Sequence, residues 1–143
     1  MDLRTQYLNL SLCSPLVASA GPLTGTEAGI RRLAATGVGA VVLPSLFEEQ
    51  LRNDLERDSL LAEAYADSNN EAHGYLPDSG DGPGQYLDLI SRAAEAVDIP
   101  VIASLNGVST GGWTDYAAAM EQAGASAIEI GRASCRERVS CCV

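Results

Sequence analysis

The spacing of hydrophobic positions changes several times along the chain, which predicts alternating strands and helices. Leu8, Leu10 and Leu12 alternate with polar residues, the period of a half-exposed strand. After Pro15, residues 16–18 form a short continuous apolar run. We therefore expect a short hairpin followed by a first buried strand.

The segment after this strand has the pattern of a helix between a glycine turn and a glycine stop. Residues 19–22 break the strand, and Thr24 or Thr26 can cap a helix that ends at Gly37. Residues 40–43 are then a second apolar run, typical of a parallel strand covered on both faces. Pro44 and Ser45 are expected to end that strand.

Three further helices and two further strands are predicted downstream. The expected helices run from Phe47 to about Ala66, from Tyr86 to Val97 and from Trp113 to Ala123, and residues 67–84 are expected to be an exposed loop. Residues 101–104 and 127–130 are the third and fourth expected strands. Each follows the end of a helix.

An internal repeat indicates how these elements combine. Residues 33–42 and 119–128 both read as helix end, glycine, small residues and buried strand. Such βα repeats are typical of a parallel α/β fold. No strand is followed by the G-x-G-x-x-G turn of open dinucleotide-binding sheets, which favours a barrel.

The length limits this barrel to a part of one. A (β/α)8 TIM barrel takes about 250 residues, and the chain has 143. The predicted fold class is therefore α/β, a partial (β/α)8 TIM barrel with roughly the first four βα units. The chain is expected to be a fragment.

The last residues change character. Residues 130–139 read IGRASCRERV, which at every position resembles the translation of a common sequencing adapter. Residues 140–143 do not continue that resemblance. We predict that residues 1–129 belong to the domain and that residues 130–143 are a non-native tail.

Composition excludes several classes of partner. The net charge of −10 disfavours nucleic acid and anionic lipid, and no apolar run is long enough to span a membrane. The N-terminus does not resemble a signal peptide, so a cytoplasmic location is expected. All basic residues are arginine, which excludes a Schiff-base lysine, and the cysteine spacing suits neither disulfides nor zinc.

Small and polar residues stand where the predicted strands end. These are residues 19–21, Ser45 and residues 104–107. In a (β/α) barrel this is the end that carries the active site, and short side chains let a ligand approach the backbone closely. The same residues are also compatible with nothing more than tight turns.

Three stretches resemble a known family. They are NLSLCSPLVASAG at residues 9–21, AVVLPSLFEEQ at residues 40–50 and PVIASLNG at residues 100–107. They are similar to the dihydroorotate dehydrogenase family, in a branch described as dihydroorotate dehydrogenase-like. The resemblance extends from Asp2 to about Glu129.

The resemblance implies an FMN-dependent oxidoreductase that oxidises a dihydropyrimidine such as dihydroorotate in pyrimidine biosynthesis. It implies a small-molecule substrate and a possible homo-oligomer when the protein is full length. The implied FMN contacts are Ser19, Ala20, Gly21, Ser45, Ser104 and Asn106. Asn69 and Asn70 are candidates for substrate binding, and the catalytic base is expected beyond Glu129.

Two departures from the family keep alternatives open. The family's substrate-binding asparagine-methionine-glycine-leucine loop is not recognisable in residues 68–75. Pro44 stands where the family usually has a lysine that contacts flavin and orotate. The alternatives are a flavin-binding module without catalysis and a phosphate-binding TIM-barrel enzyme that uses no flavin.

Overall fold

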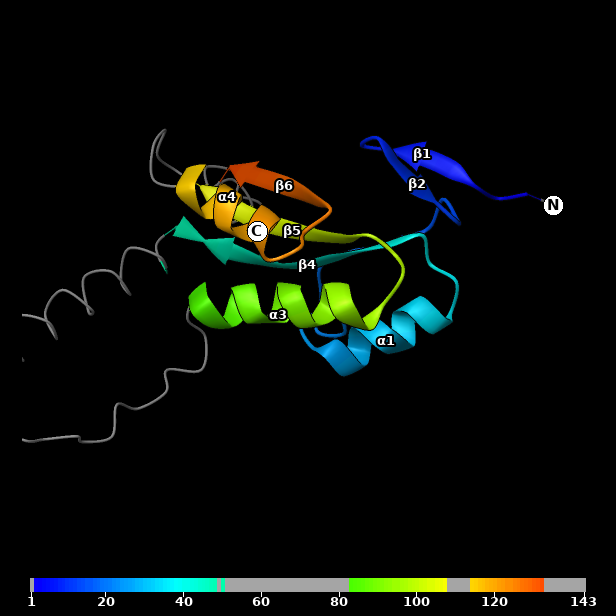
Figure 1. The fold of residues 1–143 in the computed structure, drawn as a ribbon, viewed down its shortest axis with the longest axis horizontal. Helices are drawn as coiled ribbons and strands as arrows, with labels where there is room; N and C mark the ends of the chain where they lie inside the picture. Colours follow the sequence, from blue (N-terminus) through cyan, green and yellow to red (C-terminus); the bar gives the residue numbers. More distant parts are fainter. Residues whose placement is uncertain (1, 49, 51–82, 108–113, 133–143) are drawn as a thin grey trace, which may run out of the picture.

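The computed structural model describes residues 2–48, 50, 83–107 and 114–132 (Figure 1). In chain order the elements are β1 (Thr5–Tyr7), β2 (Leu10–Leu12), β3 (Val17–Ala18), α1 (Glu27–Ala35), β4 (Ala40–Phe47), α3 (Pro83–Ala96), β5 (Val101–Gly107), α4 (Thr114–Gln122) and β6 (Ala127–Arg132). The predicted alternation of strands and helices is confirmed for these segments.

The last four strands form one parallel sheet. Its order is β3-β4-β5-β6, so strands that follow one another in the chain are neighbours in the sheet. The predicted α/β fold with a parallel sheet is confirmed. Within the described residues the sheet is open, with β3 and β6 at its edges.

Helices α1, α3 and α4 cover the same face of this sheet, which we call the helix face. Ile30 of α1, Ile90 of α3 and Met120 of α4 are fully buried in one cluster with residues of the strands. The strand members of this cluster are Val41, Leu43, Leu46, Val101, Ala103 and Leu105. Burying each large side chain contributes about 1.5–3 kcal/mol, so this layer is the main core.

The internal repeat of the sequence is confirmed. Gly37 after α1 has a φ of +84° and Gly124 after α4 has a φ of +105°. Glycine adopts this left-handed conformation without a steric cost, which ends a helix and redirects the chain into the next strand. Both units therefore end their helix with a glycine in the left-handed conformation at the same position.

Local sequence fixes the helix starts. The Thr26 hydroxyl accepts a hydrogen bond from the Gly29 amide at 3.2 Å, so Thr26 caps α1, while Thr24 is buried in the preceding turn. Helix α3 begins at Pro83, inside the predicted loop, because proline suits a first helical position, which needs no N–H partner.

The predicted end of the second strand is wrong. Strand β4 continues through Pro44 and Ser45 to Phe47. Val42 pairs with Ile102, but the next pair is Ser45 with Ser104, so β4 has one residue more than β5 between these pairs. This β-bulge accommodates Pro44, which has no N–H to offer a ladder.

Two predicted boundaries fall elsewhere or outside the described residues. Strand β6 extends to Arg132, three residues into the segment that the sequence assigns to a non-native tail, and pairs with β5 along its length. The helix expected to begin at Phe47 and the loop expected at residues 67–84 lie mostly outside the described residues. Of these, Phe47 belongs to β4 and Glu48 is helical.

The predicted hairpin is confirmed, and it packs on the other face of the sheet, which we call the hairpin face. Strands β1 and β2 are antiparallel, with Leu8 and Asn9 at positive φ in the turn. Leu12 packs with Ala40 and Ile102 in a second buried cluster. In Figure 1 the hairpin lies near the end of the sheet where the strands begin, across the strands from α1 and α3.

The first strand of the sheet is less buried than predicted. Leu16 is 66% exposed and Val17 is 38% exposed. Strand β3 pairs only with β4, through two residues, and the described segments provide no neighbour on its outer side. An edge position therefore explains why an apolar run remains open to solvent.

Candidate functional site

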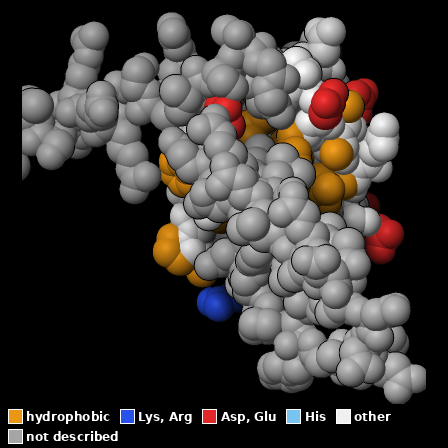
Figure 2. All heavy atoms as spheres, turned by 90° about the vertical axis from the view of Figure 1, so that its left-hand side faces the viewer, with side chains coloured by type: hydrophobic (Ala, Val, Ile, Leu, Met, Phe, Trp, Pro, Cys, Tyr) orange, Lys and Arg blue, Asp and Glu red, His pale blue; other side chains and the backbone are white. Residues whose placement is uncertain are grey.

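The carboxyl-terminal half of the hairpin face carries several polar side chains, with Phe47 beside Asn106 in its last row. Side chains alternate between the two faces of a strand, and residues paired in a parallel sheet share a face. Val42, Ile102 and Ala127 therefore form one row, and Ser45, Ser104 and Glu129 form the next. Figure 2 views the molecule from the side toward which the carboxyl ends of the strands point, and acidic side chains lie beside hydrophobic ones in its upper right part.

Two predicted site residues from different strands meet in this row. The Ser45 and Ser104 hydroxyl oxygens are 2.8 Å apart, a hydrogen bond in which either can donate. Ser104 is 4% exposed and Ser45 is partly buried. Since each hydroxyl also has further acceptor capacity, the pair can bind one more polar group on the hairpin face.

A tyrosine on the helix side holds the backbone of Ser104. The Ser104 amide donates to the Tyr86 hydroxyl at 2.9 Å, and the hydroxyl donates to the Ser104 carbonyl at 3.2 Å. Burial raises the pKa of Tyr86 to about 12, against a smaller lowering by the hydrogen bond from Ser104. The hydroxyl therefore stays protonated and keeps its donor hydrogen at neutral pH.

Asn106 lies one row further along the same face. It pairs with Gly131 of β6, and its side-chain oxygen occupies the space that a Cβ at position 131 would need. Only glycine leaves room for the carboxamide there. The predicted residues Ser45, Ser104 and Asn106 therefore share one face of the sheet, and Glu129 joins them.

The turn after β3 contains the other predicted contacts. Ser19 and Ala20 are exposed. The Gly21 amide donates to the Thr24 hydroxyl at 3.0 Å, and that hydroxyl donates back to the Gly21 carbonyl at 3.0 Å. The Gly21 N–H is already bonded to Thr24, so it is not available to a ligand. The turn offers a ligand only the surface of its small residues.

A cavity of about 380 Å³ lies between β4, α3 and the turn after β3. Pro44, Ser45 and Tyr86 line it together with Asp88 and Arg92 of α3. Gly25 is also in the lining, and a Cβ there would meet Pro44 at 3.5 Å. The turn after β3 therefore reaches the bulge of β4.

Sequence reasoning missed Tyr86 and Glu129 and placed two candidates elsewhere. Asn69 and Asn70 lie outside the described residues. In the sequence Tyr86 belongs to an apolar helical stripe, which indicates a packing role. A buried tyrosine in such a stripe also needs a hydrogen-bond partner for its hydroxyl, and this is the signal that could identify it. Glu129 was visible as a polar residue within an apolar strand.

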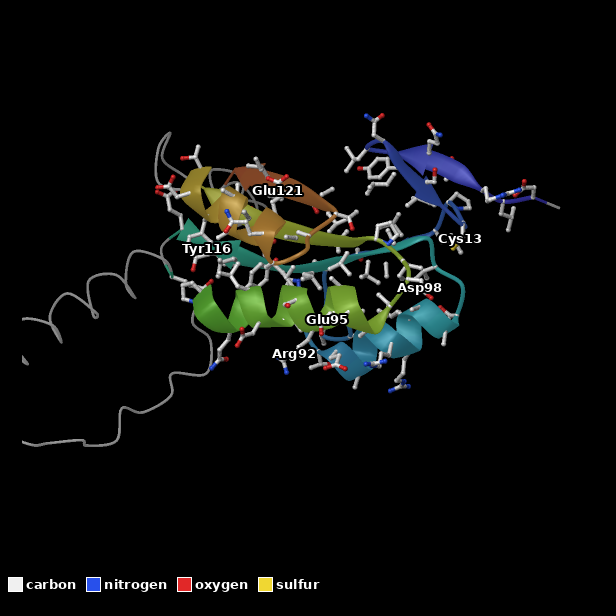
Figure 3. The ribbon with its side chains drawn as sticks, viewed as in Figure 1. Cys13, Arg92, Glu95, Asp98, Tyr116 and Glu121 are labelled. Carbon is white, nitrogen blue, oxygen red and sulfur yellow. The ribbon has the colours of Figure 1, made fainter. Side chains whose placement is uncertain are left out.

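Metal binding and membrane crossing can be checked for the described residues. They contain no group of three or more His, Cys, Asp and Glu side chains that could hold a metal ion. None of the helices in these segments has the length and apolar character needed to cross a bilayer. Arg92 and Glu95 belong to α3 and Glu121 to α4, elements of the helix face (Figure 3).

No model of a known protein family matches the chain, and no curated protein matches it. The resemblance to dihydroorotate dehydrogenases therefore stays a prediction from the residues that carry it.

Proposed function

We propose that this chain is the N-terminal part of an FMN-dependent (β/α)8-barrel oxidoreductase of the dihydroorotate dehydrogenase-like type. The observation that carries the proposal is the Ser45–Ser104 hydroxyl pair, 2.8 Å apart at the carboxyl ends of adjacent parallel strands. Barrel enzymes build their sites at this end of the strands.

The arrangement of the sheet supports a barrel. Its strands follow chain order, and α1, α3 and α4 all pack on one face, as in a barrel with an outer ring of helices. The hairpin covers the amino end of the opposite face. Leu16 and Val17 at the β3 edge are exposed, which suits an edge that a further strand covers.

The polar side chains on the hairpin face fit the edge of a flavin ring. Ser45, Ser104 and Asn106 offer hydroxyls and a carboxamide, which can both donate and accept hydrogen bonds. Ser19, Ala20 and Gly21 would form a small wall beside these side chains. When bound, FMN supplies the acceptor for the hydride that leaves the substrate.

A cyclic dihydropyrimidine is the proposed substrate class. Its oxidation removes a hydride and a proton, and the described hairpin-face residues would orient the flavin that takes the hydride. The base that takes the proton is assigned beyond Glu129. Pro44, at the family's lysine position, lines the cavity beside α3 and brings no positive charge to an anionic substrate.

The test begins with the source DNA across the codons for residues 127–143 and continues with the protein that the open frame encodes. We expect the purified protein to be yellow, with flavin released on denaturation, and its flavin to bleach when dihydroorotate is added without oxygen. A colourless protein that binds no added FMN overturns the proposal. A yellow protein that dihydroorotate does not bleach supports binding without this oxidation.

A variant ties the test to the site. Ser45→Ala with Ser104→Ala removes both hydroxyls and should lower FMN affinity by about tenfold or more, the effect of about one hydrogen bond. Ser11→Ala, at an exposed position of the hairpin strand β2, is the matched control and should leave FMN affinity unchanged. Equal affinities of all three proteins would remove the hydroxyl pair from the flavin site.

A further inference from the structure

The bulge in β4 leaves a gap in the ladder next to Ser104. The Val41 amide donates to the Pro100 carbonyl at 3.1 Å, so the Pro100 carbonyl points toward β4. In a parallel strand this direction alternates, and the Ser126 amide bonds to Val101 on the other side. Ser104 therefore turns its N–H and C=O toward β4, where the register shifts.

The Tyr86 hydroxyl fills this gap. It accepts from the Ser104 amide at 2.9 Å and donates to the Ser104 carbonyl at 3.2 Å, so one side-chain oxygen serves two backbone groups. A buried backbone group without a partner costs about 1–3 kcal/mol. Here the hydrogen-bond partner of the Ser104 backbone is a side chain of α3 rather than the backbone of β4.

We propose that Tyr86 is a positioning residue that fixes the Ser45–Ser104 hydroxyl pair for the ligand of the hairpin face. Tyr86 contacts the backbone of Ser104 from the helix side, and the Ser104 side chain bonds to Ser45 on the hairpin face. The position of Ser104 decides where the pair lies. The part of this inference that concerns flavin rests on the proposed function.

The Tyr86 hydroxyl must keep a hydrogen to donate to the Ser104 carbonyl. A tyrosine is protonated at neutral pH even at its ordinary pKa of 10.0, and burial raises the pKa of Tyr86 to about 12, so the hydrogen is also kept at alkaline pH. The same side chain lines the cavity beside α3.

The first test needs no flavin. Amide hydrogen exchange of the whole chain is compared in the natural protein, Tyr86→Phe and the control Tyr7→Phe, a tyrosine that is 53% exposed. In Tyr86→Phe we expect the Ser104 amide to exchange about tenfold faster, as expected for loss of about one hydrogen bond. Ala103 and Leu105, which turn toward β6, should keep their protection.

Two results of this test overturn the inference. One is unchanged protection at Ser104 in Tyr86→Phe. The other is an equal loss of protection along all of β5, because a residue that only stabilises the core would act on the whole strand. Both results are independent of flavin, so they separate this inference from the proposed function.

The second test is a double-mutant cycle on FMN affinity in the protein of the open frame. Tyr86→Phe and Ser104→Ala should each weaken FMN binding by about tenfold, and the double variant should be no weaker than either single variant. Tyr7→Phe should bind as the natural protein does. Additive effects, or an unchanged affinity in Tyr86→Phe, overturn the positioning role. If the natural protein binds no FMN, the proposed function fails, and the exchange test alone decides the inference.

Discussion

At its amino end the hairpin face is covered by Leu12 of the hairpin, which packs on Ala40 and Ile102. Toward the carboxyl ends of the same strands this face carries Ser45, Ser104 and Asn106 instead. The same strands run through both halves of this face. One half is closed by packing, and the other keeps polar groups available, so stability and ligand binding are separated along each strand.

Two neighbouring residues of β5 show the same contrast between packing and polar contact. Leu105 is fully buried among the helices, while its neighbour Ser104 turns its hydroxyl to the opposite face. Two adjacent residues of β5 thus serve different purposes. Substitutions at these two positions should separate the cost of lost packing from the loss of a polar contact.

The largest expected effect is that of Leu105→Ala. Removing a fully buried leucine should lower the free energy of unfolding by about 3 kcal/mol, the lost transfer energy plus a cavity. Ser104→Ala at the next position should cost only about 1 kcal/mol, the usual contribution of one hydrogen bond. Urea unfolding of both variants measures the difference, and equal losses would refute the contrast between the two faces.

A smaller effect is expected where the hairpin joins the sheet. A Cβ at Gly39 would overlap the Ser14 carbonyl oxygen and approach the Leu12 side chain at 3.1 Å. Gly39→Ala should therefore cost about 1–3 kcal/mol through overpacking. Gly84 in α3 has open space around it, so Gly84→Ala should stabilise by about 0.5–1 kcal/mol. The midpoint of thermal unfolding should fall in Gly39→Ala and rise in Gly84→Ala. A shift in the same direction in both variants would contradict this expectation.

The last expected effect is a pH dependence, which is absent at neutral pH and appears only in alkaline solution. Tyr86 has a folded-state pKa of about 12 against a model value of 10.0, so the folded protein retains its proton more strongly. This stabilisation is complete below about pH 10 and is lost as pH rises toward about 12, by at most about 2 kcal/mol. Unfolding followed across this range should show the loss in the natural protein, and Tyr86→Phe should lack that part of it.

Much of the fold could be predicted because the signals are local. The glycines at positions 37 and 124 and the apolar runs of β4 and β5 are sufficient to indicate repeated βα units. The parallel sheet follows, because two consecutive strands with a helix between them favour parallel pairing.

The errors arise where a residue's role depends on a partner far along the chain. Pro44 ends a strand by local rules, but Tyr86 supplies two hydrogen bonds that β4 cannot, and the strand continues through a bulge. Ser45 and Ser104 could be nominated from their positions at strand ends. Their contact could not be predicted, because it depends on a register shift that no local pattern records.

The packing of the hairpin on the sheet also affects how the chain folds during synthesis. Strands β1 and β2 are synthesised before β4 and β5, yet Leu12 needs both Ala40 and Ile102 to be buried. Ile102 is synthesised only after α3 is complete. The hairpin must therefore wait with its apolar side uncovered, and translation pauses before β5 should lengthen the time in which chaperones can bind it.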